Sequence, residues 1–127
     1  MRWIRQDPVT EDTCGQCAIA MLLGISKREA IKRVGHDTGT DTPELARVLR
    51  AGGLRVGRSL RRIRDLERIA TERALLLGFW KRYPHWMVWN DGRIFDPVEG
   101  IVPVRIRGLP PVLRVTHYLS VAPAREG

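Results

Sequence analysis

The apolar positions of this chain follow a helical pattern in its first half and a strand-like pattern in its second half. From Cys14 to Leu23 nearly every residue is apolar, which predicts a helix buried on all sides. Gly24 follows directly, and glycine commonly ends a helix in the left-handed conformation. Thr13 stands at the N-cap position with Gln16 three residues later, which predicts a capping box. We therefore expect this helix to lie at the centre of the fold.

Further helices are predicted over 26–35, 41–53 and, as a short arginine-rich element, 63–69. The first would be capped reciprocally by Ser26 and Glu29. The second has a proline near its start and two glycines at its end, which are the positions where helices favour these residues. The third is predicted from the apolar residues Ile63, Leu66 and Ile69, which are spaced three apart. These segments give the N-terminal half a helical character.

After residue 73 the period changes to that of strands. Asp91-Gly92 is a strong signal for a two-residue hairpin turn. Strands are predicted over 74–80, 85–90 and 93–97. The regions 98–104 and 112–121, separated by a Gly-Pro-rich stretch, give one or two further strands. Helices followed by an antiparallel sheet define an α+β fold. No repeat or linker interrupts residues 1–127, so we expect one domain.

The buried helix begins with a thiol. In the first turn of a helix, unpaired N–H groups and the positive end of the helix dipole favour a thiolate, which makes Cys14 a candidate nucleophile. The hairpin register predicted from Asp91-Gly92 places Asp96 diagonal to His85 on the same face, close enough for their side chains to hydrogen-bond. Gln6 lies just upstream of the thiol and offers an amide donor. Cysteine, base, carboxylate and amide are the parts of an acyl-transfer site.

Two other histidines, His36 and His117, could replace His85 as the base. Neither has a carboxylate at a spacing that predicts contact, so we expect both to be structural.

These residues resemble those of a known family. Gln6, the run Thr13-Cys14-Gly15-Gln16-Cys17 with its apolar continuation, His85-Trp86-Met87-Val88 and Phe95-Asp96-Pro97 are similar, in order and spacing, to the bacteriocin-leader (double-glycine) peptidases of the papain-like cysteine peptidase superfamily. The resemblance implies a papain-like fold, with a helical part packed on an antiparallel sheet, and a peptide or protein substrate. It implies that Cys14 is the nucleophile, His85 the base and Asp96 its orienting partner, with Gln6 and the Cys14 N–H forming the oxyanion hole. Leader peptidases are commonly fused to a membrane transporter that this chain lacks, so we expect a stand-alone enzyme, bacterial or phage-encoded.

Two other functions remain open from the residues. Cys14 and Cys17 form a Cys-x-x-Cys pattern at a helix start, as in thiol–disulfide oxidoreductases, although too few residues precede it for a β-α unit. Cys17 is otherwise a small core residue. Two cysteines with scattered histidines make a poor zinc site, and we expect no metal or cofactor. Hydrolase and acyl transferase share one machinery, and the sequence does not separate them.

Charge adds one further alternative. The chain carries a net charge of +8, and its arginines are densest between Arg55 and Arg68. This segment could contact nucleic acid or an acidic protein, or be a solvated helix face. A catalytically inactive papain-like binding module that uses the segment is therefore the main alternative to a peptidase. No apolar stretch is long enough to span a bilayer and no secretion signal is present, so we expect a cytoplasmic protein with no membrane contact; the sequence leaves the oligomeric state open.

Overall fold

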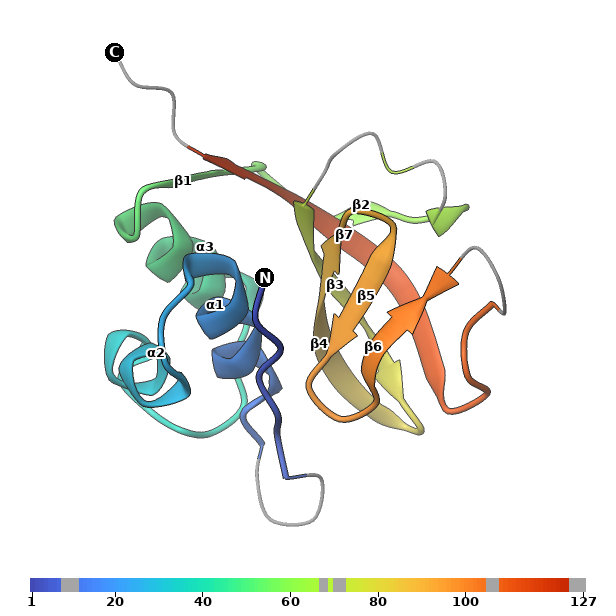
Figure 1. The fold of residues 1–127 in the computed structure, drawn as a ribbon. Coiled ribbons are helices and arrows are strands. Elements are labelled where there is room, and N and C mark those ends of the chain that lie inside the picture. The colour runs from blue at the N-terminus through green and yellow to red at the C-terminus, as the bar shows by residue number, and fades with distance from the viewer. Residues whose placement is uncertain (8–11, 67–68, 70–72, 105–107, 124–127) are drawn as a thin grey trace.

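The structure, a computed structural model, describes residues 1–7, 12–66, 69, 73–104 and 108–123. Three helices come first and an antiparallel sheet follows (Figure 1). The helices are α1 (Cys14–Leu23), α2 (Lys27–Val34) and α3 (Thr42–Ala51). The strands are β1 (Leu54–Val56), β2 (Arg61–Arg62), β3 (Arg73–Trp80), β4 (Tyr83–Asn90), β5 (Arg93–Asp96), β6 (Gly100–Pro103) and β7 (Leu113–Pro123). The predicted α+β class is confirmed.

Helix α1 is buried along nearly its whole length, as its apolar composition predicted. It ends at Gly24, which has a φ of 67° and so provides the left-handed C-cap. The predicted capping box at its start is wrong, because the Thr13 side chain makes no capping hydrogen bond. Gln16 instead donates to the backbone oxygens of His36 and Thr38, at 2.9 and 3.0 Å. These loop carbonyls supply the partners that the buried Nε2 amide needs.

Helix α3 begins with the capping features that its sequence predicts, whereas α2 shows one half of its predicted reciprocal cap. Ser26 Oγ accepts a hydrogen bond from the Glu29 N–H, at 3.0 Å. At α3, Asp41 and Glu44 form a complete capping box with proline in the first turn. Both helices pack against α1, and the three together form the helical side of the molecule (Figure 1).

The sheet has the strand order β1-β7-β3-β4-β5-β6, with β2 also paired to β7. All its pairings are antiparallel. At the β4–β5 turn, Asp91 and Gly92 have φ values of 49° and 79°, as a tight two-residue hairpin turn requires. The predicted register is confirmed, with Val88 opposite Phe95 and Asn90 opposite Arg93.

The short helix predicted over 63–69 is only partly described. Residues 63–65 are not helical, whereas the Ile69 N–H donates to the Leu66 oxygen, at 3.3 Å. Just before this range lies β2, where Arg61 pairs with Tyr118 and Arg62 with His117 of β7. The three apolar residues that suggested a helix, Ile63, Leu66 and Ile69, pack against the sheet. Residues 67–68, on which the prediction also relied, lie outside the described residues.

Two hydrophobic clusters hold the fold together. The larger joins the helices to one face of the sheet, where Trp86, Val88 and Phe95 meet α1. The smaller lies on the opposite face around Met87, Trp89 and Ile94. Alternate residues of β4 therefore enter different clusters, as the pleat of a strand requires.

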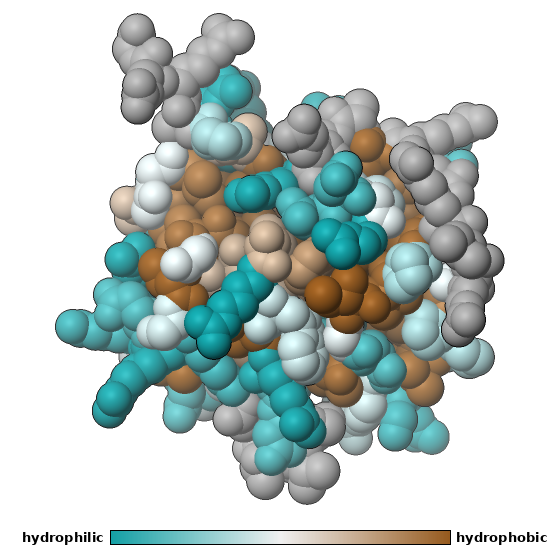
Figure 2. Space-filling view, viewed as in Figure 1, coloured by the Kyte–Doolittle hydropathy of each residue, from teal (hydrophilic) through white to brown (hydrophobic). Residues whose placement is uncertain are grey.

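The surface shown in Figure 2 mixes polar and apolar residues, with hydrophilic side chains projecting from the helical side and hydrophobic ones showing between them. Among the described residues, no helix has the length and hydrophobicity needed to cross a membrane.

Candidate active site

The Cys14 thiol lies at the first residue of α1, where that helix packs against β4. Only 6% of the residue is exposed. Its Sγ atom accepts a hydrogen bond from the backbone N–H of Trp86, at 3.5 Å. The packing of α1 on the sheet therefore brings together a nucleophile and a strand that lie 72 residues apart.

His85 lies in β4 and hydrogen-bonds to groups on two other elements. Its Nε2 atom lies 3.0 Å from Asp96 Oδ1 and 2.9 Å from Asp96 Oδ2. Its ring also forms a hydrogen bond with the Cys14 side chain. Because Nε2 faces the carboxylate, Nδ1 is the ring nitrogen left for the thiol. The imidazole thus lies between a sulfur and a carboxylate, the arrangement that the hairpin register favours.

Three effects determine the protonation of His85. Burial alone would lower its pKa, because a charged ring is poorly solvated there. The hydrogen bonds to Asp96 and Cys14, together with the negative charges of those groups, outweigh burial and raise the pKa of His85 to about 9. Near neutral pH the ring is therefore an imidazolium.

Backbone groups hold the Asp96 carboxylate in place. The N–H groups of Val98 and Glu99 donate to Oδ1, at 2.8 and 2.9 Å. The Trp3 indole donates to the Asp96 carbonyl oxygen, at 2.7 Å. Asp96 is completely buried, so these bonds replace water as its partners.

Gln6 reaches the site from the N-terminal segment. Its backbone N–H donates to the Pro97 oxygen, at 2.8 Å, which holds the segment beside the β5 end. Its Oε1 accepts from the Thr13 N–H, at 3.0 Å. Thr13 directly precedes the helix that begins with Cys14, so this bond ties Gln6 to the start of α1, and the side-chain Nε2 amide of Gln6 is left as the donor.

All four predicted residues come together, since Gln6, Cys14 and His85 line one pocket of about 570 Å³ and Asp96 supports His85 from behind. One wall is aromatic, with Trp80 and Tyr83 stacked at 6.5 Å between ring centroids. The remaining lining is Asp12, Gly39, Thr40, Pro84 and Trp86. The pocket gives a substrate direct access to the thiol.

Sequence reasoning missed the residues that support the pocket from behind. A Cβ atom on Gly15 would lie 2.0 Å from Thr40 Oγ1, so only glycine lets the 39–40 loop approach the start of α1. Gln16 holds the preceding residues of that loop through its two carbonyl contacts. A glycine in the first turn of an otherwise apolar helix was the available signal, because helices disfavour glycine without such a contact.

The remaining candidates lie apart from the thiol. His36 Nε2 contacts Glu44 Oε2 at 2.5 Å, a contact that sequence spacing did not predict, and His117 Nδ1 contacts Thr116 Oγ1 at 2.9 Å. Neither histidine lines the Cys14 pocket. Cys17 is fully buried, with its Sγ 3.7 Å from the Arg5 carbonyl oxygen, and no disulfide joins Cys14 and Cys17. Across the described ranges, no group of three histidine, cysteine or acidic residues could hold a metal ion.

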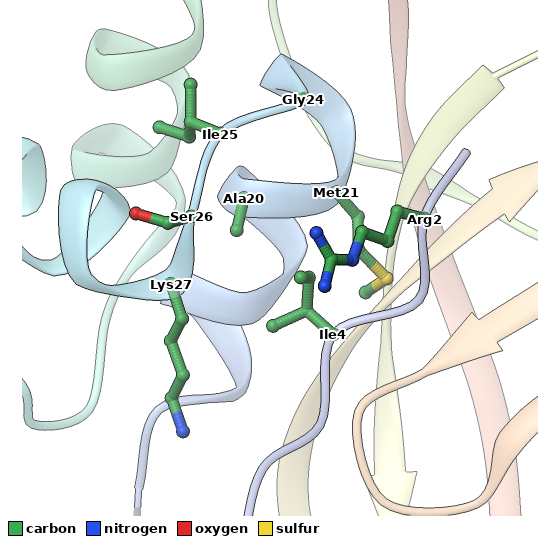
Figure 3. Close-up of a pocket in the computed structure, with 8 residues that line it drawn as sticks. All are labelled: Arg2, Ile4, Ala20, Met21, Gly24, Ile25, Ser26 and Lys27. Carbon is green, nitrogen blue, oxygen red and sulfur yellow. The ribbon is translucent and has the colours of Figure 1, made fainter.

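A separate pocket of about 360 Å³ lies between the N-terminal segment and the end of α1. Figure 3 shows Ile4 facing α1 between Arg2 and Lys27. Lys27 Nζ donates to the Arg5 carbonyl oxygen, at 3.3 Å. None of the four predicted site residues lines this pocket.

The fold belongs to the α+β class, and its helices packed on an antiparallel sheet are consistent with a papain-like fold. The chain is similar to a solved structure described as a double glycine motif protease from an AMS/PCAT transporter in complex with the leader peptide. The similarity has a TM-score of 0.68 and covers 97% of this chain and 93% of that one, at 18% sequence identity. No protein-family model matches the chain, and no curated protein matches it. The resemblance to the double-glycine peptidases is thus confirmed at the level of the fold, and the roles of the four residues stay predictions.

Proposed function

We propose that this protein is a cysteine peptidase, or a closely related thiol acyl-transfer enzyme, with Cys14 as its nucleophile. The contact of one buried imidazole with both the thiol and the Asp96 carboxylate carries the proposal. A structural histidine needs no sulfur partner, whereas a nucleophilic cysteine needs a base within hydrogen-bonding reach.

The first half of the reaction forms an acyl-enzyme. The electron pair of the Cys14 thiolate forms a bond to the carbonyl carbon of the substrate, and the π electrons of the carbonyl group move onto its oxygen. The Cys14 N–H and Gln6 Nε2 stabilise that oxyanion. The His85 imidazolium donates its proton to the leaving nitrogen as the C–N bond breaks. An amine and a thioester on Cys14 result.

The second half releases the acyl group. Neutral His85 takes a proton from water, whose oxygen attacks the thioester carbon, and the C–S bond breaks to regenerate the thiolate. An amine in place of water would give transfer instead of hydrolysis. Asp96 keeps the ring oriented through both halves.

A peptide is the substrate we propose. The similar solved protein is described as a protease in complex with a leader peptide. In this chain the pocket that contains Cys14 is open and combines an aromatic wall with polar groups, which suits an extended peptide backbone.

Selective alkylation tests the nucleophile. The protein is treated with iodoacetamide over a pH series, and the labelled cysteine is mapped by mass spectrometry. We expect rapid labelling of Cys14 at about pH 6, well below the ~8.5 at which an ordinary thiol ionises, with Cys17 as an internal control. His85→Ala should remove this selectivity. A proteome-derived peptide library then reports cleavage, with Cys14→Ser as the blank.

Equal and slow labelling of both thiols would contradict the proposal and favour the inactive binding module. A readily formed Cys14–Cys17 disulfide would favour the oxidoreductase. The fold already weighs against the latter, because its helices precede an antiparallel sheet and do not alternate with parallel strands.

A further inference from the structure

A second pocket, also of about 570 Å³, adjoins the one that contains Cys14. Pro84 lines both, so the two hollows share a wall. The second pocket lies on β2, β3 and β7, and its floor includes Leu77, Phe79 and Val115. A substrate that extends beyond the thiol pocket in this direction would therefore enter it.

Strand register shows that the floor is continuous. Residues directly opposite in neighbouring strands place their side chains on one face. One row runs from Pro84 through Phe79 to Arg114, and a second runs from Trp86 through Leu77 and His117 to Arg62. Trp86 is the residue whose N–H bonds to Cys14. Both rows thus begin beside the nucleophile and end at cationic side chains.

The titratable side chains in the described lining of the second pocket are basic. Among the described residues, its lining contains Arg62, Arg114 and His117 and no aspartate or glutamate. Neither arginine forms an ion pair with a carboxylate in the part of the chain that the structure describes. Arg114 lies over the Phe79 ring, 5.3 Å from its centroid, which holds the guanidinium at the floor. Two exposed positive charges therefore line this pocket, where an anionic side chain would find partners.

We infer that this pocket receives an acidic segment of the peptide substrate. The inference rests on the proposed function, because it places the acidic residues relative to the bond that Cys14 attacks. Arg114 lies on β7, two strands from β4, and Arg62 lies on β2, one strand further. At ~4.8 Å between strands, an extended peptide covers these intervals in about three to four residues. The preferred substrate thus has a glutamate or aspartate three to four residues from the scissile bond.

Nucleic acid fits this pocket less well. Single strands are held by basic grooves that also present free aromatic faces for base stacking. The described lining offers two aromatic rings: Phe79, which Arg114 already covers, and the His117 imidazole, whose Nδ1 is engaged with Thr116 Oγ1 at 2.9 Å. A carboxylate needs no stacking surface, and two guanidinium groups are its preferred partners.

Electrophilic peptides test the inference. Chloromethyl ketone peptides place a Glu-Glu pair three to four residues before the reactive carbon, and N-chloroacetyl peptides place it after. Gln-Gln peptides are the neutral references. We expect one Glu-Glu series to alkylate Cys14 about tenfold faster than its reference at low salt, an advantage that 1 M salt removes.

Adjacent arginines supply a matched control. Arg62→Glu should abolish the advantage, whereas Arg61→Glu makes the same charge change on the same strand and should retain it, since Arg61 pairs with Tyr118 and points to the other face. Arg114→Gln is a milder second variant that should reduce the advantage. Iodoacetamide rates and circular dichroism check that each variant keeps its fold and thiol reactivity.

Each outcome is decisive. Normal iodoacetamide labelling of Cys14 with equal rates for Glu-Glu and Gln-Gln peptides in both series would overturn this inference and leave the proposed function standing. Failure of all reagents to select Cys14 would overturn the proposed function itself. Tighter binding of a single-stranded oligonucleotide than of the Glu-Glu peptide, weakened equally by both arginine reversals, would assign the surface to nucleic acid and also overturn the inference.

Discussion

The Nε2 atom of His85 lies almost equally far from the two carboxylate oxygens of Asp96, at 3.0 and 2.9 Å. Asp96 Oδ1 also accepts two backbone N–H groups, so the carboxylate cannot rotate freely. The carboxylate therefore fixes both the ring orientation and the nitrogen that faces Cys14. Removing its charge should change His85 more than it changes the fold.

Asp96→Asn is expected to lower the pKa of His85 from about 9 to below its ordinary value of 6.5. The amide keeps an oxygen for the Val98 and Glu99 N–H groups but loses the charge, so burial then favours the neutral ring. Titration of the His85 ring carbons by NMR measures the shift, with His36→Gln and His117→Gln used to assign the other two histidines. An unchanged His85 titration would show that Asp96 does not set the charge of the ring.

The same pair makes stability depend on pH. The pKa of His85 rises from 6.5 in the unfolded chain to about 9 in the fold, so protonation stabilises the fold fully below pH 6.5. This contribution, on the order of 3 kcal/mol, is lost as the pH rises through about 9.

Urea denaturation over this pH range should therefore show a midpoint that falls towards alkaline pH. His85→Leu should flatten the curve, whereas Cys14→Ser keeps the His85–Asp96 pair and should retain most of the slope. A slope that persists without His85 would assign the pH dependence to other groups.

Substitution of Gly15 tests the close approach of the 39–40 loop. Helix propensity alone predicts that Gly15→Ala stabilises the protein by about 1 kcal/mol. The added Cβ would lie 2.0 Å from Thr40 Oγ1, so we expect a net destabilisation of about 1–3 kcal/mol instead.

Chemical denaturation of Gly15→Ala, Thr40→Gly and the double variant measures the coupling between the two positions. Removing the Thr40 side chain should recover much of the loss, because it takes away the clashing atoms. Stabilisation by Gly15→Ala alone would contradict the observed packing.

Local signals in the sequence predicted the parts of the fold that local interactions determine. Asp91-Gly92 fixes the β4–β5 register within a few residues, and the His85–Asp96 contact follows from that register. Gly24 and the Asp41 cap mark helix ends for the same reason.

The remaining contacts depend on partners that lie far away in the sequence. Gln16 has the sequence context of a capping residue, yet its side-chain amide donates to carbonyl oxygens 20 and 22 residues away. Segment 61–62 became a strand because β7, more than fifty residues later, supplies its partners. The hydrogen bond from Trp86 to Cys14 likewise requires α1 to pack on β4. The sequence identifies these residues, and only tertiary packing determines their contacts.

Gln6 provides a test that separates catalysis from positioning. Its Oε1 is engaged by the Thr13 N–H, which leaves Nε2 to stabilise an oxyanion. Gln6→Ala should therefore lower the turnover of a peptide identified in the cleavage screen by about 10²- to 10³-fold. Alkylation by iodoacetamide forms no oxyanion, so its rate at Cys14 should change little.

Gln6→Glu sharpens this comparison. A carboxylate still accepts the Thr13 N–H bond but places a negative charge where the oxyanion forms, so turnover should fall at least as far as in Gln6→Ala. If either substitution slowed alkylation as much as cleavage, Gln6 would act by holding the start of α1 and thus the thiol itself. Equal losses would make Gln6 a positioning residue, and the Cys14 N–H would remain as the oxyanion donor.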